Sequence, residues 1–222
     1  METTEQKTAL VVGATGAVGR ELMAQLCAHP AYDKVTAWVR RPLAAADIPL
    51  ACAGAKLQVR QIDFERLADI APETNDEVYC ALGTTIKQAG SQEAFWRVDV
   101  DYPIALAQWA KKAGAGKFIL ISAPGADSTS RIFYSRAKGA AEEGVRAAGF
   151  SSLFIIHPPL IDAVRAQRRT GERISIAVLR LLPRFVLPSY QPMTPSEIAA
   201  ATLRAVQRAA AGEHIIEPRL VP

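Results

Sequence analysis

The sequence lacks the features of a secreted or membrane-spanning protein. Residues 1–7 are polar and precede the first apolar run directly, without the basic start and long apolar stretch of a signal peptide. No uninterrupted apolar segment reaches the roughly 18 residues that a membrane span requires, so we expect no stable membrane insertion. The three cysteines, Cys27, Cys52 and Cys80, are scattered and form no C-x-x-C pair. These absences favour a reducing compartment, and we expect the cytoplasm.

Support for metal and nucleic-acid sites is also missing. The three histidines, at positions 29, 157 and 214, have no metal-ligand spacing, so we predict no metal. Residues 163–184 hold six arginines against one acid, but no aromatic residues interleave with them to stack on bases. We therefore expect no nucleic-acid partner. A solvated helix face is the simplest explanation of these arginines, and a surface for an anionic substrate or partner is the alternative.

Strand and helix patterns alternate along the chain. Short apolar, β-branched runs predict strands at 8–12, 34–39, 57–62, 77–82, 117–121 and 152–156, and helical periodicity covers 17–28, 98–113 and 133–148. Such alternation predicts an α/β fold, a doubly wound parallel sheet of the Rossmann type with helices on both faces. No linker-like segment divides the chain, so we expect one domain over residues 1–222.

Beyond Pro158 the pattern changes. Six prolines interrupt residues 158–195, leaving one apolar helix near 173–182 and another over 195–211. We expect residues 158–222 to cap the substrate side of the sheet. The helix near 173–182 is apolar almost all round, which burial against the core explains better than contact with a membrane surface or a second subunit. The sequence neither predicts nor excludes a homo-oligomer.

The turn after the first strand reads Gly13-Ala14-Thr15-Gly16-Ala17-Val18-Gly19. It stands where a strand hands over to a helix. Glycine lets the backbone turn sharply and approach a pyrophosphate, and the free N–H groups of the helix N-terminus attract the anion. This context predicts a dinucleotide site formed by Gly13, Thr15, Gly16, Ala17, Val18 and Gly19. The absence of Gly-Lys-Ser/Thr argues against a P-loop nucleotidase.

The end of the second strand indicates which dinucleotide binds. A site for NAD usually carries an acid there to bind the ribose hydroxyls, whereas this chain has Arg40 and Arg41. Guanidinium groups bind the additional phosphate of NADP by charge-assisted hydrogen bonds. We therefore predict that NADP(H) is preferred, with NAD(H) possible. The alternative is that one or both arginines lie in solvent and leave nucleotide affinity unchanged.

A candidate catalytic set follows the fifth strand. Tyr134 and Lys138 are four apart on a predicted helix, so one face presents both, and the ammonium can lower the pKa of the phenol and hold the cofactor ribose. A tyrosine so activated can protonate a carbonyl oxygen, and Ser122 at the strand end can hydrogen-bond the same oxygen. The alternative is that Tyr134 and Lys138 are simply exposed residues on a helix surface, which is the usual case for this spacing in an arbitrary protein.

Together these residues make the chain resemble the atypical short-chain dehydrogenase/reductase superfamily, and more narrowly the NmrA-like and Tat-interacting-protein-like oxidoreductases. The resemblance covers about residues 8–160 and adds four stretches to the motifs above, namely Asp63-Phe64, Leu82-Gly83-Thr84-Thr85, Val98-Asp99 with Asp101-Tyr102, and Gly125-Ala126-Asp127. It implies that Asp63 and Phe64 border the adenine, and that Leu82, Gly83, Thr84 and Thr85 line the cofactor.

Two positions depart from the pattern of these relatives. Ser122-Ala123 stands where many have a Ser-Ser pair, and His157-Pro158-Pro159 stands where an Arg-Pro-Gly turn often follows the sixth strand. The first departure keeps Ser122, and the second affects the nicotinamide pocket. His157 can donate to a substrate, although a hydrogen-bonded structural histidine is the simpler interpretation.

Two functions follow from this resemblance and these residues. The first is an NADPH-dependent carbonyl reductase of a small-molecule substrate, with Tyr134 as the acid, Lys138 as its support and Ser122 as the orienting donor. The alternative is a non-catalytic sensor that binds NADP(H) and a protein partner. The residues do not identify the substrate.

Overall fold

The computed structural model describes residues 6–44, 48–52, 54, 56–159 and 192–222. Within this part of the chain, seven strands form one parallel sheet in the order β3-β2-β1-β4-β5-β6-β7. The strands are β1 (Lys7–Val12), β2 (Tyr32–Val39), β3 (Leu57–Gln61), β4 (Glu77–Cys80), β5 (Lys117–Ile121), β6 (Ser152–Ile156) and β7 (Gly212–Ile216). The predicted Rossmann-type α/β fold is confirmed, because the strand order reverses between β1 and β4.

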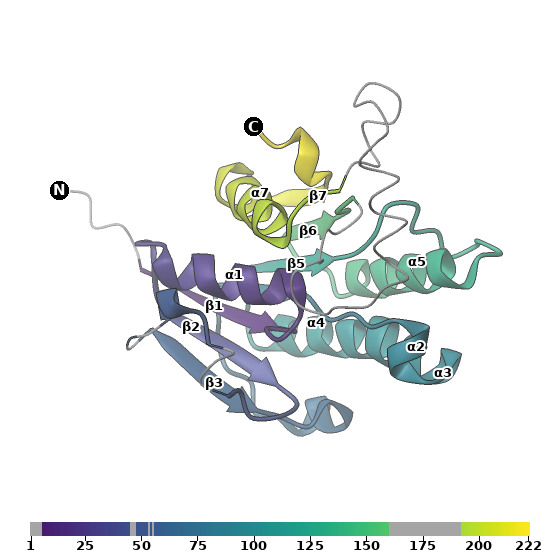
Figure 1. Cartoon of the computed structure of the whole chain (residues 1–222), viewed down its shortest axis with the longest axis horizontal. Helices are drawn as coiled ribbons and strands as arrows, with labels where there is room; N and C mark the ends of the chain where they lie inside the picture. The colour runs from purple at the N-terminus through teal and green to yellow at the C-terminus, as the bar shows by residue number, and fades with distance from the viewer. Residues whose placement is uncertain (1–5, 45–47, 53, 55, 160–191) are drawn as a thin grey trace.

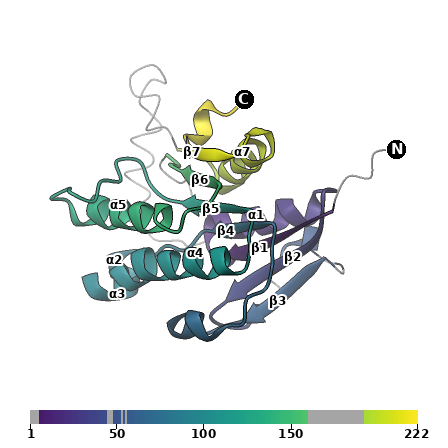
Figure 2. The ribbon, with the colours of Figure 1, turned by 180° about the vertical axis from the view of Figure 1, so that it is seen from behind.

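Helices cover both faces of the sheet. The helical segments are α1 (Ala17–Ala28), α2 (Ile86–Ala89), α3 (Gln92–Trp96), α4 (Tyr102–Lys112), α5 (Phe133–Arg146) and α7 (Pro195–Arg208), the short helices η2 (Leu50–Cys52), η3 (Phe64–Asp69) and η6 (Pro218–Leu220), and the π-helical turn η4 (Arg97–Asp101). α1 and α7 lie on one face, and α4 and α5 on the other (Figures 1 and 2).

The sequence of β1 shows why the sheet is covered twice. Its side chains alternate between the two faces. Ala9 and Val11 belong to the core cluster with Leu22 of α1, while Leu10 and Val12 belong to the cluster under α4. All five residues are fully buried. A strand that is apolar at every position therefore needs a helix layer on each side, as in other parallel sheets.

Several predicted boundaries were wrong. The strand predicted over 77–82 ends at Cys80, which leaves residues 81 and 82 in the loop that follows β4. The helix predicted over 98–113 is π-helical over Arg97–Asp101 and becomes α-helical at Tyr102. The short helices α2 and α3 precede it and were not predicted.

The C-terminal part contributes to the sheet as well as covering it. The helix expected over 195–211 is present as α7 and ends at Arg208. It is followed by β7, an unpredicted strand that pairs in parallel with β6. The arginines of 163–184 and the helix expected near 173–182 lie outside the described residues. The substrate cap over 158–222 therefore stays a prediction.

Candidate functional site

The glycine turn between β1 and α1 is packed too closely for side chains. Gly13 has φ +90°, and a Cβ added there would lie 2.4 Å from the carbonyl oxygen of Ala81 in the loop after β4. A Cβ on Gly19 would lie 2.2 Å from the carbonyl oxygen of Gly13. The first turn of α1 has no side-chain cap and no acidic residue. Its N–H groups therefore remain suited to an anion such as a pyrophosphate.

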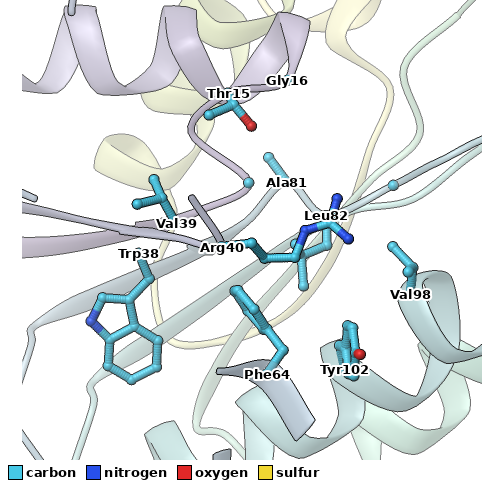
Figure 3. Close-up of a pocket in the computed structure, with 12 residues that line it drawn as sticks. Thr15, Gly16, Trp38, Val39, Arg40, Phe64, Ala81, Leu82, Val98 and Tyr102 are labelled. Atoms are coloured by element: carbon cyan, nitrogen blue, oxygen red, sulfur yellow. The ribbon is translucent and has the colours of Figure 1, made fainter. Parts of the chain in front are cut away.

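A cavity opens beside this turn, at the carboxyl ends of the central strands (Figure 3). In doubly wound sheets this edge is where ligands bind. The lining comes from the turn, from the residues that end β2 and follow β4, and from η3, η4 and α4. These residues are Gly13, Thr15, Gly16, Trp38, Val39, Arg40, Phe64, Ala81, Leu82, Gly83, Val98 and Tyr102.

Seven of the predicted cofactor residues therefore meet around one cavity. They are Gly13, Thr15, Gly16, Arg40, Phe64, Leu82 and Gly83. Asp63 lines a second hollow, which shares Arg40 with the cavity and also includes Gln61 and Ile62. The side chain of Asp63 accepts a hydrogen bond from the backbone N–H of Glu65 and so caps η3.

The remaining predicted cofactor residues lie near the cavity without lining it. Ala17, Val18 and Gly19 form the first turn of α1. Thr84 donates its backbone N–H to Asp99, and Thr85 caps α2 by accepting from the N–H of Gln88. Arg41 is exposed and lines neither hollow. The sequence predicts the same role for both arginines, but the structure places only Arg40 at the cavity.

Five lining residues were not predicted as cofactor residues. Trp38 and Val39 end β2, Ala81 follows β4, and Val98 and Tyr102 lie on the helical segment behind the cavity. For the first three residues the signal was present, because each stands at the carboxyl end of a predicted parallel strand. Val98 and Tyr102 belong to a stretch that the resemblance marked, Val98-Asp99 with Asp101-Tyr102, but no cofactor role was predicted for them.

Lys138 of α5 lies in a buried ion pair. Its ammonium is 2.7 Å from Oδ1 of Asp99, and both side chains are at least nine-tenths buried. The other carboxylate oxygen of Asp99 accepts the N–H of Thr84 at 2.9 Å. Burial raises the pKa of Asp99, and the charge and hydrogen bond of Lys138 oppose that rise. Asp99 thereby ties the predicted catalytic lysine to the loop after β4, which lines the cavity.

Ser122 is held by a different carboxylate of α5. Its hydroxyl donates to Oε1 of Glu142 at 2.5 Å, and His157 Nε2 lies 2.8 Å from the same oxygen. Arg146 contacts the other oxygen at 3.3 Å. Burial raises the pKa of Glu142, but the hydrogen bonds from His157 and Ser122 and the charges of His157 and Arg146 outweigh it and hold the pKa below its ordinary value. His157 thus has the hydrogen-bonded environment expected of a structural histidine.

Tyr134 stands at the start of α5, one turn before Lys138. It is 46% exposed, and the centroid of its ring lies 6.1 Å from that of Phe95. Its hydroxyl has no hydrogen-bond partner among the described residues. The helix therefore places Tyr134 and Lys138 on neighbouring turns, one reaching the surface and the other buried. Within the described part of the chain, no group of three or more His, Cys, Asp and Glu side chains is arranged to hold a metal ion.

A glycine turn at a helix N-terminus, placed at the reversal point of a parallel sheet, defines a dinucleotide-binding α/β protein. Residues 13–174 match the model of the NAD(P)H-binding family, and the chain belongs to that family. It is 32% identical over 181 residues to Protein HTATIP2 of Rattus norvegicus, covering 81% of this chain and 73% of the relative. The resemblance to Tat-interacting-protein-like atypical short-chain dehydrogenases/reductases is thus confirmed.

Fungal proteins give the same result. The chain is 33% identical over 209 residues to "Protein FMP52, mitochondrial" of Chaetomium globosum, covering 92% of this chain and 88% of the relative. The printed name of that relative gives a mitochondrial location, so the cytoplasmic location expected for this chain stays a prediction. No helix in the part of the chain that the structure describes is long and apolar enough to cross a membrane.

Solved structures share the fold at low sequence identity. One is MoeE5 in complex with UDP-glucose and NAD, with a TM-score of 0.69 and 17% identity, covering 95% of this chain and 75% of that one. Another is the UDP-Glc/GlcNAc 4-epimerase from Campylobacter jejuni, with a TM-score of 0.70 and 15% identity over 95% of this chain and 78% of the other. These likenesses establish the Rossmann-like architecture of the chain.

Proposed function

We propose that this protein is an NADP(H)-dependent oxidoreductase that reduces a carbonyl group of a small molecule. The observation that carries the proposal is the position of Arg40, a cation on the rim of the cavity beside the glycine turn. Val39 ends β2 where NAD-specific sites carry an acid, so no carboxylate from that strand end opposes a phosphate. The tight packing of Gly13 and Gly19 fits a backbone that approaches a dinucleotide closely.

NADPH supplies the hydride in this proposal, and the residues of the chain bind and orient. Arg40 binds the additional phosphate, and the first turn of α1 binds the pyrophosphate. Tyr134 donates a proton to the substrate oxygen, and Lys138 supports it with its positive charge. Ser122 orients the same oxygen. In the structure its hydrogen is directed at Glu142, so donation to a substrate requires the hydroxyl to turn, while His157 and Arg146 continue to contact the carboxylate.

The binding of nucleotide tests the proposal first. Titration of the purified protein with NADPH and NADH, followed by fluorescence, is expected to show tighter binding of NADPH, and the double substitution Arg40→Ala/Arg41→Ala is expected to remove the preference. A carbonyl screen under NADPH then tests turnover. Tyr134→Phe is expected to abolish turnover while it retains NADPH binding. Full activity of Tyr134→Phe would exclude Tyr134 as the acid.

One observation favours a second candidate function, a non-catalytic sensor of NADP(H). The Lys138 ammonium is ion-paired with buried Asp99, and the Tyr134 hydroxyl has no partner among the described residues. The Tyr134 hydroxyl and the Lys138 ammonium are therefore not hydrogen-bonded to each other. A sensor is expected to bind NADP⁺ and NADPH with different affinities, to bind a protein partner in only one of these states, and to tolerate Tyr134→Phe.

A further inference from the structure

A hydrogen bond crosses from η3 to the start of α4 beside the cofactor cavity. The Tyr102 hydroxyl donates to Oε1 of Glu65 at 2.6 Å, and Nη1 of Arg97 lies 3.4 Å from the same oxygen. Glu65 follows β3, whereas Arg97 and Tyr102 belong to the helical segment after β4. These contacts join segments that are distant in the chain, since Arg97 is 32 residues and Tyr102 is 37 residues from Glu65.

The ring of Tyr102 is part of the cavity wall. It lies 5.5 Å from the ring of Phe64 with an interplanar angle of 35°, and both residues line the cavity. Figure 3 shows the two rings side by side, on the same side of Arg40. The predicted catalytic residues Ser122 and Lys138 do not line this cavity. The aromatic wall thus belongs to the part of the site nearest Arg40.

The π-helical turn directs neighbouring residues in two directions. Val98 and Tyr102 both line the cavity, while Asp99 pairs with Lys138. Turns of this type are rare and frequently occur at functional sites. Burial and the neighbouring Glu65 raise the pKa of Tyr102 to about 12. Its hydroxyl therefore remains a donor to Glu65 at physiological pH.

We propose that Tyr102 contacts the adenosine half of the dinucleotide and that Glu65 and Arg97 are positioning residues that hold its ring in the cavity wall. The inference rests on the proposed binding of NADP(H). Arg40 marks the end of the site that takes the ribose phosphate, so the aromatic wall beside it meets the adenine end and not the nicotinamide. A flat base gains affinity from contact with an aromatic ring, whereas a guanidinium–carboxylate pair at the rim fixes where that ring lies.

Three probes divide the site into its halves. NADPH spans the site. 2′-phospho-ADP-ribose carries the adenosine half, the pyrophosphate and the second ribose but lacks the nicotinamide, whereas reduced nicotinamide mononucleotide lacks the adenosine half. Affinities for each are measured by calorimetry or fluorescence on the full chain. Tyr102→Ala is expected to weaken NADPH and 2′-phospho-ADP-ribose by about tenfold, the scale of one lost base–ring contact. Its affinity for reduced nicotinamide mononucleotide is expected to equal that of the wild type.

The positioning role is tested at Glu65. Glu65→Ala removes the acceptor of the Tyr102 hydroxyl and is expected to weaken 2′-phospho-ADP-ribose severalfold, whereas Glu65→Gln keeps an acceptor oxygen and is expected to retain most of the affinity. Asp69→Ala is the matched control. It removes a carboxylate from the same short helix, where Asp69 pairs with Arg66 at the surface. A purely electrostatic effect of losing a carboxylate would strengthen the binding of the phosphate, so a loss of affinity in Glu65→Ala with unchanged affinity in Asp69→Ala supports the positioning role, whereas a gain in Glu65→Ala would contradict it.

The outcomes separate this inference from the proposed function. A wild-type protein that binds no nucleotide would overturn both. Wild-type binding of NADPH with undiminished affinity in Tyr102→Ala would overturn the inference alone, as would equal losses for both half-probes. Tyr102→Phe guards against a folding defect, because it keeps the ring and removes only the bond to Glu65. Melting temperatures are measured for each variant, and Tyr102→Phe is expected to match Glu65→Ala in affinity.

Discussion

Ser122 and Glu142 share a buried hydrogen bond, with the serine hydroxyl 2.5 Å from Oε1 of the glutamate. The bond joins the end of β5 to the middle of α5, and His157 joins the end of β6 to the same carboxylate. Glu142 therefore connects three elements at the carboxyl edge of the sheet. Because its ionised form accepts these bonds, its charge contributes to the stability of the fold.

The pH dependence of stability follows from this connection. The pKa of Glu142 in the folded protein is held below its ordinary value of 4.5. A depressed carboxyl pKa stabilises the fold at pH values above the unfolded pKa, and the contribution is lost as the pH falls through the folded value. We expect Glu142→Gln to lower the free energy of unfolding by about 2 kcal/mol at pH 7, and the difference from the wild type to shrink below pH 4.5.

Urea denaturation at several pH values between 7 and 3 measures this effect. Glu143→Gln is the matched control, because the neighbouring glutamate also accepts from a serine, Ser128, but at the exposed surface. We expect it to change stability little at any pH, since exposed interactions contribute little. An unchanged difference between wild type and Glu142→Gln from pH 7 to pH 3 would contradict the ionised role of Glu142.

The two arginines after β2 give a second prediction. Arg40 lines the cavity, whereas Arg41 lines neither hollow. We expect Arg40→Ala alone to weaken NADPH by about tenfold, with little effect on NADH, because a charge-assisted bond to the additional phosphate is lost. Arg41→Ala is expected to have a smaller effect. Fluorescence titration of the single variants checks this order, and equal losses would show that both side chains reach the phosphate.

Gly19 gives a third prediction, in which packing decides against helix propensity. Alanine in a helix is ordinarily favoured over glycine by about 1 kcal/mol. In Gly19→Ala the new Cβ would lie 2.2 Å from the carbonyl oxygen of Gly13, which belongs to the cofactor turn. Backbone must move, so we expect a loss of about 1–3 kcal/mol in stability and a clear loss of NADPH affinity.

Gly144→Ala provides the comparison for Gly19→Ala. Gly144 also lies within a helix, and its added Cβ would meet the side chain of Ile104 at 2.3 Å. A side chain can move where the backbone of a turn cannot, and neither Gly144 nor Ile104 lines the cofactor cavity. We expect Gly144→Ala to keep wild-type affinity for NADPH. Calorimetry and thermal unfolding of both variants measure the two effects separately.

The sequence predicted the parts of this protein that local patterns encode. The apolar strands of the sheet, the glycine turn and Arg40 are each visible within about ten residues of sequence, and the structure brings them to one edge. β7 was not predicted because it is a short edge strand with charged Glu213 and polar His214 inside it. Such a strand forms because β6 offers an unpaired edge, and that is a tertiary property.

The roles in the site that the sequence did not predict also depend on tertiary structure, even for Asp99 and Tyr102, which the resemblance had marked. Tyr102 reaches the cavity through a π-helical turn, which no periodicity indicates. Glu142 meets Ser122 across 20 residues and His157 across 15, and its role depends on burial that α5 acquires only against the sheet. Asp99 was noticed as part of a motif, but its ion pair with Lys138 depends on how α5 packs against η4.

The buried ion pair between Asp99 and Lys138 couples the contributions of the two side chains to stability. Removing one partner of a buried pair leaves an uncompensated charge, so we expect Asp99→Asn and Lys138→Met each to destabilise the fold by about 3 kcal/mol. Asn can still accept the N–H of Thr84, so the loop after β4 keeps its bond. The double variant is expected to recover part of the loss, with a coupling energy of about 1–3 kcal/mol in urea denaturation. Additive losses would mean that the two side chains do not stabilise one another, and Lys138 would then be free to act on Tyr134 without Asp99.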